Sequence, residues 1–372
     1  MKNLLAAIAA LSLLAPNASA AISVKKMVQY AQVDSAASGI ALSSNQVMVF
    51  GNREKNGFAQ IANGVTIELS CSIESFVSAA TADSEGNFYL VGAAANPIVG
   101  TLPPITDVLN PDNVVSDPIS SNKSDATTLC LWKLDSTGKI IESSTMDISS
   151  VVIPYSILVD KFGVTIAGTT FTDPGFKAII LDWNAKPIYI GKSSTRIFSI
   201  TRTTDGGTVA VGQSSEKLLD KSLRGKADGF LAKVLNGKLV SVQRSSDINS
   251  TRAWRSSTNN LLLGGNSNST AVITKFANNF TPTWTDRYPS NGSALTANVA
   301  KVNYGAFYST GSFKALPTWK KKNTILLLTF NEKGVILGAN YVEAPKLTKL
   351  NGLAANSAFG PMILASGFIY RA

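Results

Sequence analysis

The sequence repeats a unit of about 45 residues along most of its length. The clearest copy runs from Thr203 to Val242 and contains three apolar segments separated by polar turns with glycine and asparagine. A period of this length that is built only from short strands is typical of a β-propeller, in which each repeat forms one blade. The repeat therefore predicts an all-β chain.

The copies align on an apolar strand that ends at a glycine. The closing glycines of the seven copies are Gly51, Gly92, Gly168, Gly212, Gly265, Gly311 and Gly367. These strands lack the clean alternation of half-exposed strands, as expected where both faces are buried between neighbouring blades. We expect the glycine to permit a bend or a close backbone approach. The sequence predicts about seven four-stranded blades.

The two ends of the chain look like incomplete parts of one repeat. The segment Met27–Tyr30 resembles an outer strand with no strand before it, and Gly367–Tyr370 resembles a repeat that stops short. We expect the two segments to complete one blade and so close the ring. Closure removes the exposed sheet edges that would otherwise template aggregation.

The rest of the repeat follows a pattern of its own. In the clearest copy, Asp205–Gly212 is followed by Asp228–Val234 and then by a turn at Asn236 and Gly237. The pattern resembles that of bacterial exported β-propeller-repeat proteins: two glycines, an apolar strand, a glycine, Asp-x-Phe-Leu-x-Lys and a glycine turn. The resemblance covers residues 22–372 and implies about seven blades, but that family has no single activity.

The first 20 residues are typical of an export signal. Lys2 supplies a positive charge, an apolar run extends from Leu4 to Leu14, and Ala18 and Ala20 offer a small-residue cleavage site. The run is too short to cross about 30 Å of hydrocarbon, so we expect no transmembrane segment. We predict a signal peptide at 1–20 and a propeller domain at 21–372 that is secreted, periplasmic or on the cell surface.

The chain has two cysteines, Cys71 and Cys130. An even pair in an oxidising compartment favours a disulfide. Cys130 also occupies a position that is apolar in other repeats, where Phe230 and Ile179 stand, and a buried free cysteine behaves as a small hydrophobic residue. Both interpretations stay open, because the geometry of the pair decides between them.

The chain contains no histidine. This excludes Ser-His-Asp and Cys-His catalysis, and we expect neither a metal site nor a cofactor. The segment 83–87 weakly resembles a calcium loop but lacks the downstream glutamate, so we interpret it as a turn. Catalysis by carboxylates alone stays open, with Asp107, Asp112, Asp173 and Asp228 as candidates. We expect Asp228 to be structural. A polysaccharide hydrolase or lyase is therefore the alternative function, and no spacing selects a pair.

Three insertions interrupt the repeats, and repeat proteins often bind through such loops. The longest is a proline-rich loop at 96–124, which is either a binding lip over one mouth of the ring or a variable surface loop. Two shorter basic insertions occupy the same place in their repeats, so we expect all three on one face. Their candidate binding residues are Lys217, Lys221, Arg224, Lys226, Lys314, Trp319, Lys320, Lys321 and Lys322.

The formal net charge of +10 favours an anionic ligand. Outside the cytoplasm this means a cell-wall polyphosphate, an acidic polysaccharide, phospholipid headgroups or extracellular DNA, with Trp319 stacking on a sugar or base. Intracellular nucleic acid is not expected. The alternative is that the basic loops serve solubility alone, because charged runs are most often solvated. A protein partner that contacts Val108, Leu109 and Trp319 is a third interpretation. The sequence predicts an exported binding or scaffold module of the cell envelope.

Overall fold

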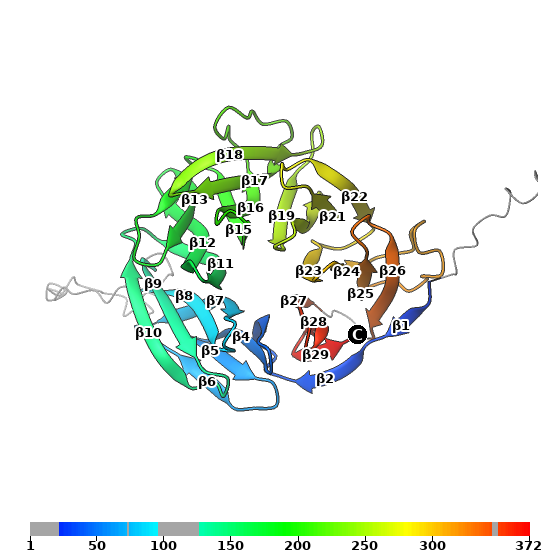
Figure 1. Ribbon diagram of the computed structural model, residues 1–372, viewed down its shortest axis with the longest axis horizontal. Coiled ribbons are helices and arrows are strands. Elements are labelled where there is room, and N and C mark those ends of the chain that lie inside the picture. The colour runs from blue at the N-terminus through cyan, green and yellow to red at the C-terminus, as the bar shows by residue number, and fades with distance from the viewer. Residues whose placement is uncertain (1–21, 73, 96–125, 344–348) are drawn as a thin grey trace, which may run out of the picture.

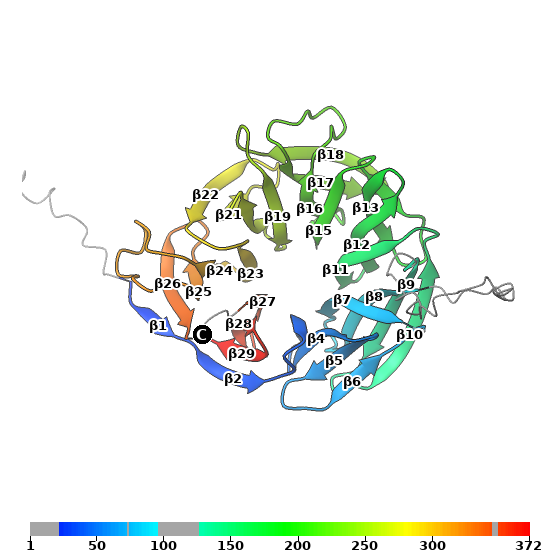
Figure 2. The same ribbon diagram turned by 180° about the vertical axis from the view of Figure 1, so that it is seen from behind.

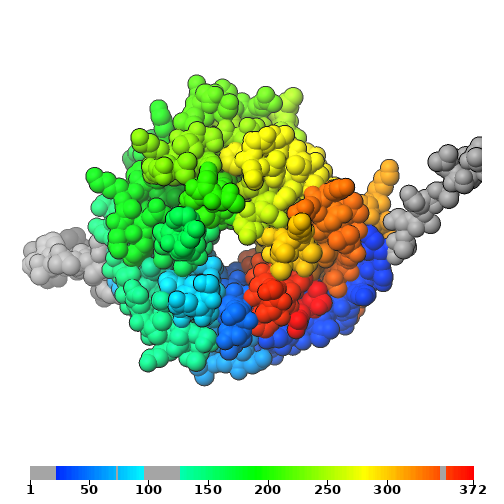
Figure 3. Space-filling view, viewed as in Figure 1, coloured from blue at the N-terminus to red at the C-terminus, as the bar shows by residue number. Residues whose placement is uncertain are grey.

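The chain folds into a ring of seven sheets around a central channel (Figures 1 and 3). The computed structural model describes residues 22–72, 74–95, 126–343 and 349–372. Within these ranges the chain forms strands and no helix. The predicted seven-bladed β-propeller with four-stranded blades is confirmed.

Each blade holds four strands that are ordered from the channel to the rim, and in blades 1 to 6 these four follow one another along the chain. Blades 1 to 3 contain β3 (Ala37–Leu42), β4 (Val47–Arg53), β5 (Asn56–Ile61), β6 (Thr66–Leu69); β7 (Ser75–Ala82), β8 (Phe88–Ala94), β9 (Thr128–Leu134), β10 (Ile140–Asp147); β11 (Val152–Asp160), β12 (Gly163–Thr172), β13 (Gly175–Asp182) and β14 (Ile188–Ile190). Blades 4 and 5 contain β15 (Thr195–Arg202), β16 (Thr208–Ser214), β17 (Asp228–Leu235), β18 (Lys238–Ser245); β19 (Arg252–Ser257), β20 (Leu262–Ser267), β21 (Thr270–Phe276) and β22 (Pro282–Tyr288). Blades 6 and 7 contain β23 (Leu295–Val299), β24 (Val302–Ser309), β25 (Thr324–Phe330), β26 (Ile336–Val342), with β1 (Val24–Lys26) on its rim; and β27 (Leu350–Asn356), β28 (Gly360–Ala365), β29 (Phe368–Arg371) and β2 (Val28–Gln32).

The alternating strand directions give the ring two different faces (Figures 1 and 2). The turns that join the first strand to the second, and the third to the fourth, emerge on one side, which we call the hairpin face. The connections between the second and third strands, and those between successive blades, emerge on the other side, which we call the loop face. Both basic insertions are connections between a second and a third strand, so they belong to the loop face.

Packing between neighbouring blades explains the continuous apolar strands. In β16, Val209 and Val211 pack into a cluster with β19 and β20 of blade 5, whereas Ala210 packs into a cluster with blade 3 on the opposite face. All three side chains are fully buried. A strand that is covered on both faces has no polar side to alternate with, as the sequence predicted.

The N-terminal segment closes the ring. Strand β2 pairs antiparallel with β29, from Val28 opposite Arg371 to Gln32 opposite Phe368, so blade 7 is built from both ends of the chain. This confirms the predicted closure. One feature was not predicted: β1 pairs parallel with β26 on the rim of blade 6. The first two strands therefore form a strap across the outside of two blades (Figure 1).

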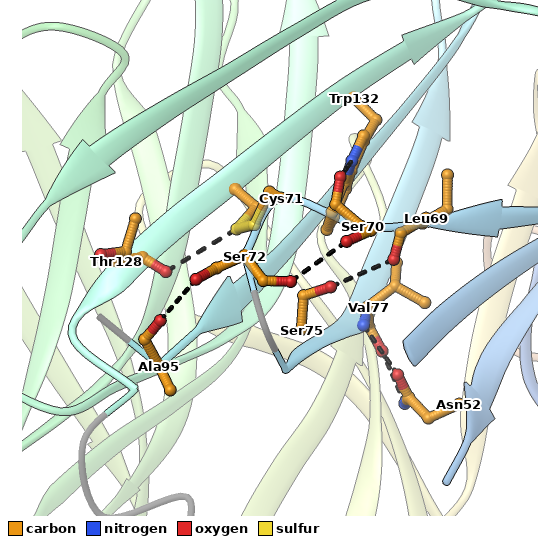
Figure 4. Close-up of a disulfide and its surroundings, with 11 residues drawn as sticks. Asn52, Leu69, Ser70, Cys71, Ser72, Ser75, Val77, Ala95, Thr128 and Trp132 are labelled. Carbon is orange, nitrogen blue, oxygen red and sulfur yellow. Dashed lines mark hydrogen bonds between the residues drawn. A yellow bond between two sulfur atoms is a disulfide. The ribbon is translucent and has the colours of Figure 1, made fainter. Parts of the chain in front are cut away.

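A disulfide joins Cys71 to Cys130 (Figure 4). Cys71 lies in the connection between blades 1 and 2, and Cys130 lies in β9, with a Cα–Cα distance of 6.2 Å that suits a disulfide. The Oγ of Ser72 donates a hydrogen bond of 2.9 Å to the carbonyl oxygen of Ala95 beside it. The Cys130 side chain is also fully buried in the core. Cys130 therefore both packs in the apolar core and forms a disulfide, so the two interpretations made from the sequence are compatible.

The acidic segment at 83–87 is the turn between β7 and β8. The Asp83 carboxylate accepts hydrogen bonds of 2.9 Å from the backbone N–H groups of Glu85 and Asn87. Burial alone would raise the pKa of Asp83, but these bonds, together with one from the Asn87 side chain, outweigh it and lower that pKa. The carboxylate oxygens are occupied within the turn, in agreement with the interpretation made from the sequence.

Candidate functional site

Six of the seven innermost strands contain a β-bulge at the same place. In each, one residue is skipped by the pairing with the second strand of its blade. A bulge bends its strand and leaves the extra residue without a ladder partner, which redirects its side chain. The six skipped residues are Ser38, Ser78, Tyr155, Phe198, Arg255 and Asn351.

The closing glycines of the repeat stand opposite these bulges. Gly212 pairs with Ile197, immediately before the skipped residue Phe198. A Cβ atom added to Gly212 would lie 1.9 Å from the carbonyl oxygen of Arg196, and one added to Gly92 would lie 1.7 Å from that of Phe76. The glycine is therefore required because the bulged backbone presses against it.

Blades 6 and 7 depart from this rule, and the alignment of their glycines was wrong. Gly311 and Gly367 lie beyond the ends of β24 and β28, not within them. Blade 6 has no bulge in its inner strand, and a Cβ atom on Gly311 would meet nothing within 4 Å. In blade 7 the residue opposite the bulge is Ala365.

Four of the bulge residues border part of the channel with uncharged side chains. Ser38, Ser78, Tyr155 and Asn351 border a section of about 230 Å³. A second section of about 290 Å³ is bordered by side chains such as Ala82, Thr258 and Asn298. No charged side chain borders either section among the described residues. The channel therefore offers little to hold a charged ligand along these sections.

A hollow of about 820 Å³ at the loop-face end of the inner strands has a different lining. Arg255 and Lys349 supply positive charge, and Asn291 and Asn351 supply amide groups. Its lining further includes Tyr308 and contains no described carboxylate. We call this hollow the mouth pocket. Cationic donors beside amide groups, with no competing carboxylate, form a surface suited to an anion.

The arginines near the mouth pocket rest on aromatic rings instead of carboxylates. The guanidinium of Arg255 lies 3.9 Å from the ring centre of Phe198, and that of Arg196 lies 4.2 Å from the ring centre of Phe176. Neither arginine takes part in an ion pair among the described residues. Loss of surrounding water and the nearby charge of Arg196 lower the pKa of Arg255. A bound anion would counteract both effects, because a nearby negative charge stabilises the charged guanidinium.

Two buried or half-buried carboxylates hold the ends of the basic insertion of blade 4 by hydrogen bonds. The buried carboxylate of Asp228 accepts hydrogen bonds from the backbone N–H groups of Arg224 and Gly225 and from Arg244 Nε at 2.8 Å. Glu216 accepts backbone hydrogen bonds from residues 192–194 of the neighbouring connection. The candidate residues Lys217, Lys221, Arg224 and Lys226 are all exposed above this base.

The basic insertion of blade 6 corrects one sequence expectation. Trp319 is only 2% exposed, and its Nε1 donates a 3.1 Å hydrogen bond to Ser309 Oγ. It cannot stack on a sugar or base, because it packs with Leu316 in the core of blade 6 and fixes the loop. Exposed basic side chains surround it, namely Lys314, Lys320, Lys321 and Lys322. The ammonium of Lys321 lies over Tyr341 and beside Glu343.

The structure brings the two basic insertions to one face but not to one spot, because blade 5 lies between them (Figure 1). The proline-rich loop at 96–124, with Asp107, Val108, Leu109 and Asp112, lies outside the described residues. Of the remaining carboxylate candidates, Asp228 is held in its structural ion pair with Arg244, as expected. Across the described ranges, no three acidic or cysteine side chains gather as a metal site would require.

The hairpin face carries a hollow with a mixed charged lining. It measures about 750 Å³ and lies where the turns of blades 2, 3 and 4 meet. Its charges have both signs, and Arg202 and Asp160 pair within it at 2.8 Å. Phe162 is exposed at its edge. This balance of charge distinguishes it from the purely cationic mouth pocket.

Comparison with known proteins identifies the fold class. No family model and no curated protein matches the chain. The β-propeller domain of Cps50 (Swd1) from Myceliophteria thermophila is 10% identical, with 93% of this chain and 98% of that chain covered and a TM-score of 0.51. The WD40 domain of coronin from Toxoplasma gondii is 10% identical, with 94% and 87% covered and a TM-score of 0.50.

These likenesses show the fold alone. The chain is a β-propeller, a fold that hosts many unrelated functions. In the part of the chain that the structure describes, no helix has the length and apolar character needed to span a bilayer.

Proposed function

We propose that the chain is an exported binding scaffold of the cell envelope that captures an anionic polymer on its loop face. The observation that carries the proposal is the mouth pocket, where Arg255 and Lys349 stand beside two asparagines without a described carboxylate. Cationic groups that no carboxylate neutralises attract acidic ligands and hold them by charge-assisted hydrogen bonds.

The basic insertions would extend this contact beyond the pocket. They place exposed lysines on the same face in blades 4 and 6, so a long acidic chain could meet the pocket and the rim together. Dissolved ions screen the attraction between exposed lysines and an acidic polymer, with a Debye length of about 8 Å at physiological salt and a shorter one at higher salt. A polymer bound in this way would therefore dissociate as salt is raised.

The test measures binding of residues 21–372 to immobilised polygalacturonate and, separately, to immobilised polyphosphate across a salt series. The two probes distinguish carboxylate from phosphate ligands. We expect Arg255→Gln combined with Lys349→Gln to weaken binding about tenfold at low salt, since two charge-assisted contacts are lost. We expect Lys320→Ser, Lys321→Ser and Lys322→Ser together to weaken it less, because these exposed groups do not line the mouth pocket.

A matched control removes the same charge from the other face. Lys186 and Lys301 are exposed in turns of the hairpin face, so Lys186→Gln with Lys301→Gln lowers the net charge equally without touching the loop face. Unchanged binding in this control is expected. Equal losses in both double variants would mean that only net charge matters, and the proposed site would be wrong.

Export has its own test. Expression of the full chain with its N-terminal segment, followed by fractionation and N-terminal sequencing, should give a product outside the cytoplasm that begins at Ala21. Retention of the intact N-terminus in the cytoplasm would contradict export and, with it, an envelope ligand.

A further inference from the structure

Large apolar side chains are exposed on two adjacent connections of blade 4. Leu219 is 52% exposed and Leu223 is 37% exposed in the connection between β16 and β17. Ile248 is 83% exposed in the connection between β18 and β19. We call residues 217–226 and 246–250 together the blade 4 tip. Both connections leave the ring on the loop face, and large apolar groups exposed on neighbouring loops are candidates for contact with another surface.

The two connections are bonded to each other. The backbone N–H of Lys226 donates a 2.8 Å hydrogen bond to the carbonyl oxygen of Ser250, and the N–H of Arg252 donates one of 2.8 Å to Ala227. Ala227 and Thr251 form a parallel bridge. Loops of blade 4 extend past its outer strand β18 at the top edge of the ring (Figure 1). Backbone hydrogen bonds thus hold the two connections of the blade 4 tip together.

Leu219 occupies a backbone conformation that its side chain does not favour. Leu218 and Lys221 exchange backbone hydrogen bonds of 3.1 and 2.9 Å, which places Leu219 and Asp220 at the end of a tight hairpin. Leu219 has a φ of 48°, where glycine and asparagine are the usual residues. It is the one large apolar residue with positive φ that is exposed in the described chain. Such strain without burial indicates a role outside the core.

Positive charge surrounds the apolar groups of the tip. Lys217, Lys221, Arg224 and Lys226 are exposed there. The acidic groups nearby are mostly engaged: Glu216 binds backbone N–H groups, Asp228 pairs with Arg244, and Asp247 pairs with Arg252 and Arg287. Asp220 pairs with Lys221 at 3.1 Å. The tip therefore presents net positive charge around three apolar side chains.

Apolar side chains flanked by lysine and arginine form the chemistry of interfacial membrane anchors, in which the apolar groups enter the acyl boundary and the cations meet acidic headgroups. We propose that the blade 4 tip docks on an anionic phospholipid bilayer by inserting Leu219, Leu223 and Ile248. This goes beyond the proposed function, because the ligand is a bilayer and the contact depends on apolar groups that a polymer site does not need.

The experiment is vesicle co-sedimentation of residues 21–372, which retain every described strand and lack the apolar N-terminal run. The vesicles are phosphatidylcholine alone, or phosphatidylcholine and phosphatidylglycerol in equal parts. We expect binding only to the second kind, weakened by salt. Leu219→Asn with Leu223→Ser and Ile248→Ser should reduce it about tenfold or more. Asparagine tolerates positive φ, so the variant should fold and melt no lower than the parent chain.

Two control measurements show whether the apolar groups of the tip are responsible for vesicle binding. Val65→Ser with Val335→Ser removes exposed apolar groups from the hairpin face, and vesicle binding should not change. The tip variant should still bind an acidic polymer as the parent chain does, so the two proposals can fail independently. Absence of vesicle binding by the parent chain, or full binding by the tip variant, would overturn the membrane proposal. If the parent chain does not bind vesicles, we would expect the tip to contact a protein surface instead.

Discussion

At the scale of single residues, the closing glycines explain how the inner strands can bulge. We expect Gly212→Ala to lower the free energy of unfolding by about 3 kcal/mol, since the added Cβ would lie 1.9 Å from a carbonyl oxygen and the bulge must shift. Chemical denaturation monitored by fluorescence measures the change. Gly311→Ala is the matched control, because its Cβ meets nothing within 4 Å and should cost little. Equal stability of the two variants would show that the glycine has no packing role.

A second prediction at this scale concerns the ion pair between Asp228 and Arg244. Burial alone would raise the pKa of Asp228, but the hydrogen bonds from Arg244 and from the backbone outweigh it and lower that pKa. A lowered folded-state pKa adds stability above the unfolded value of about 3.9, and this stability is lost as pH falls through the folded value. Asp228→Asn should therefore cost about 3 kcal/mol at neutral pH and progressively less below about pH 4.

Urea denaturation of both chains across the acid range measures this difference. Asp220→Asn serves as the control, because Asp220 is exposed and pairs with Lys221 at the end of a hairpin. A penalty for Asp228→Asn that stays constant down to acid pH would show that the carboxylate charge contributes nothing.

At the scale of elements, the disulfide ties the connection between two blades to β9. The cysteines are separated by 59 positions, and closing a loop of that length stabilises the fold by about 4 kcal/mol in the chain-entropy model. Cys71→Ala with Cys130→Ala should lower the melting temperature, and reductant should lower that of the parent chain alone. A parent chain that melts identically with and without reductant would contradict this account.

The sequence predicted the second strands but did not predict the register of the inner strands, for a physical reason. A second strand such as β16 is apolar throughout, so its signal survives without a defined register. In an inner strand the bulge shifts the side-chain alternation by one residue, and this is how Arg255 comes to line the mouth pocket. Pairwise hydrogen bonding between strands determines the bulge, and a single sequence does not record it.

The same limit applies to the predicted binding residues. The run of lysines after Trp319 indicated an exposed aromatic residue, yet tertiary packing against Leu316 and Tyr341 buries it. The exposed lysines of both insertions were correctly placed on the loop face, because strand alternation alone determines which connections share a face. Alternation could not show that blade 5 separates them.

At the scale of the whole molecule, the N-terminal strap determines whether the ring is closed. Its central residue Met27 is 2% exposed and packs between blades 6 and 7 with Ile325, Ile363 and Tyr370. Strands β1 and β2 cover the outer edges of β26 and β29 on either side of it. Removal of the strap would uncover two sheet edges and a seam of apolar residues at once.

We therefore expect deletion of residues 22–33 to give an open ring that aggregates, as measured by sedimentation velocity and by protease sensitivity. Deletion of residues 22–26 alone removes β1 but keeps Met27 and β2, so this chain should stay soluble and lose only part of its stability. We expect the longer deletion to be the less soluble of the two, because blade 7, which closes the ring, contains β2 and not β1. Melting and solubility of the longer deletion equal to those of the parent chain would show that the ring holds without its strap.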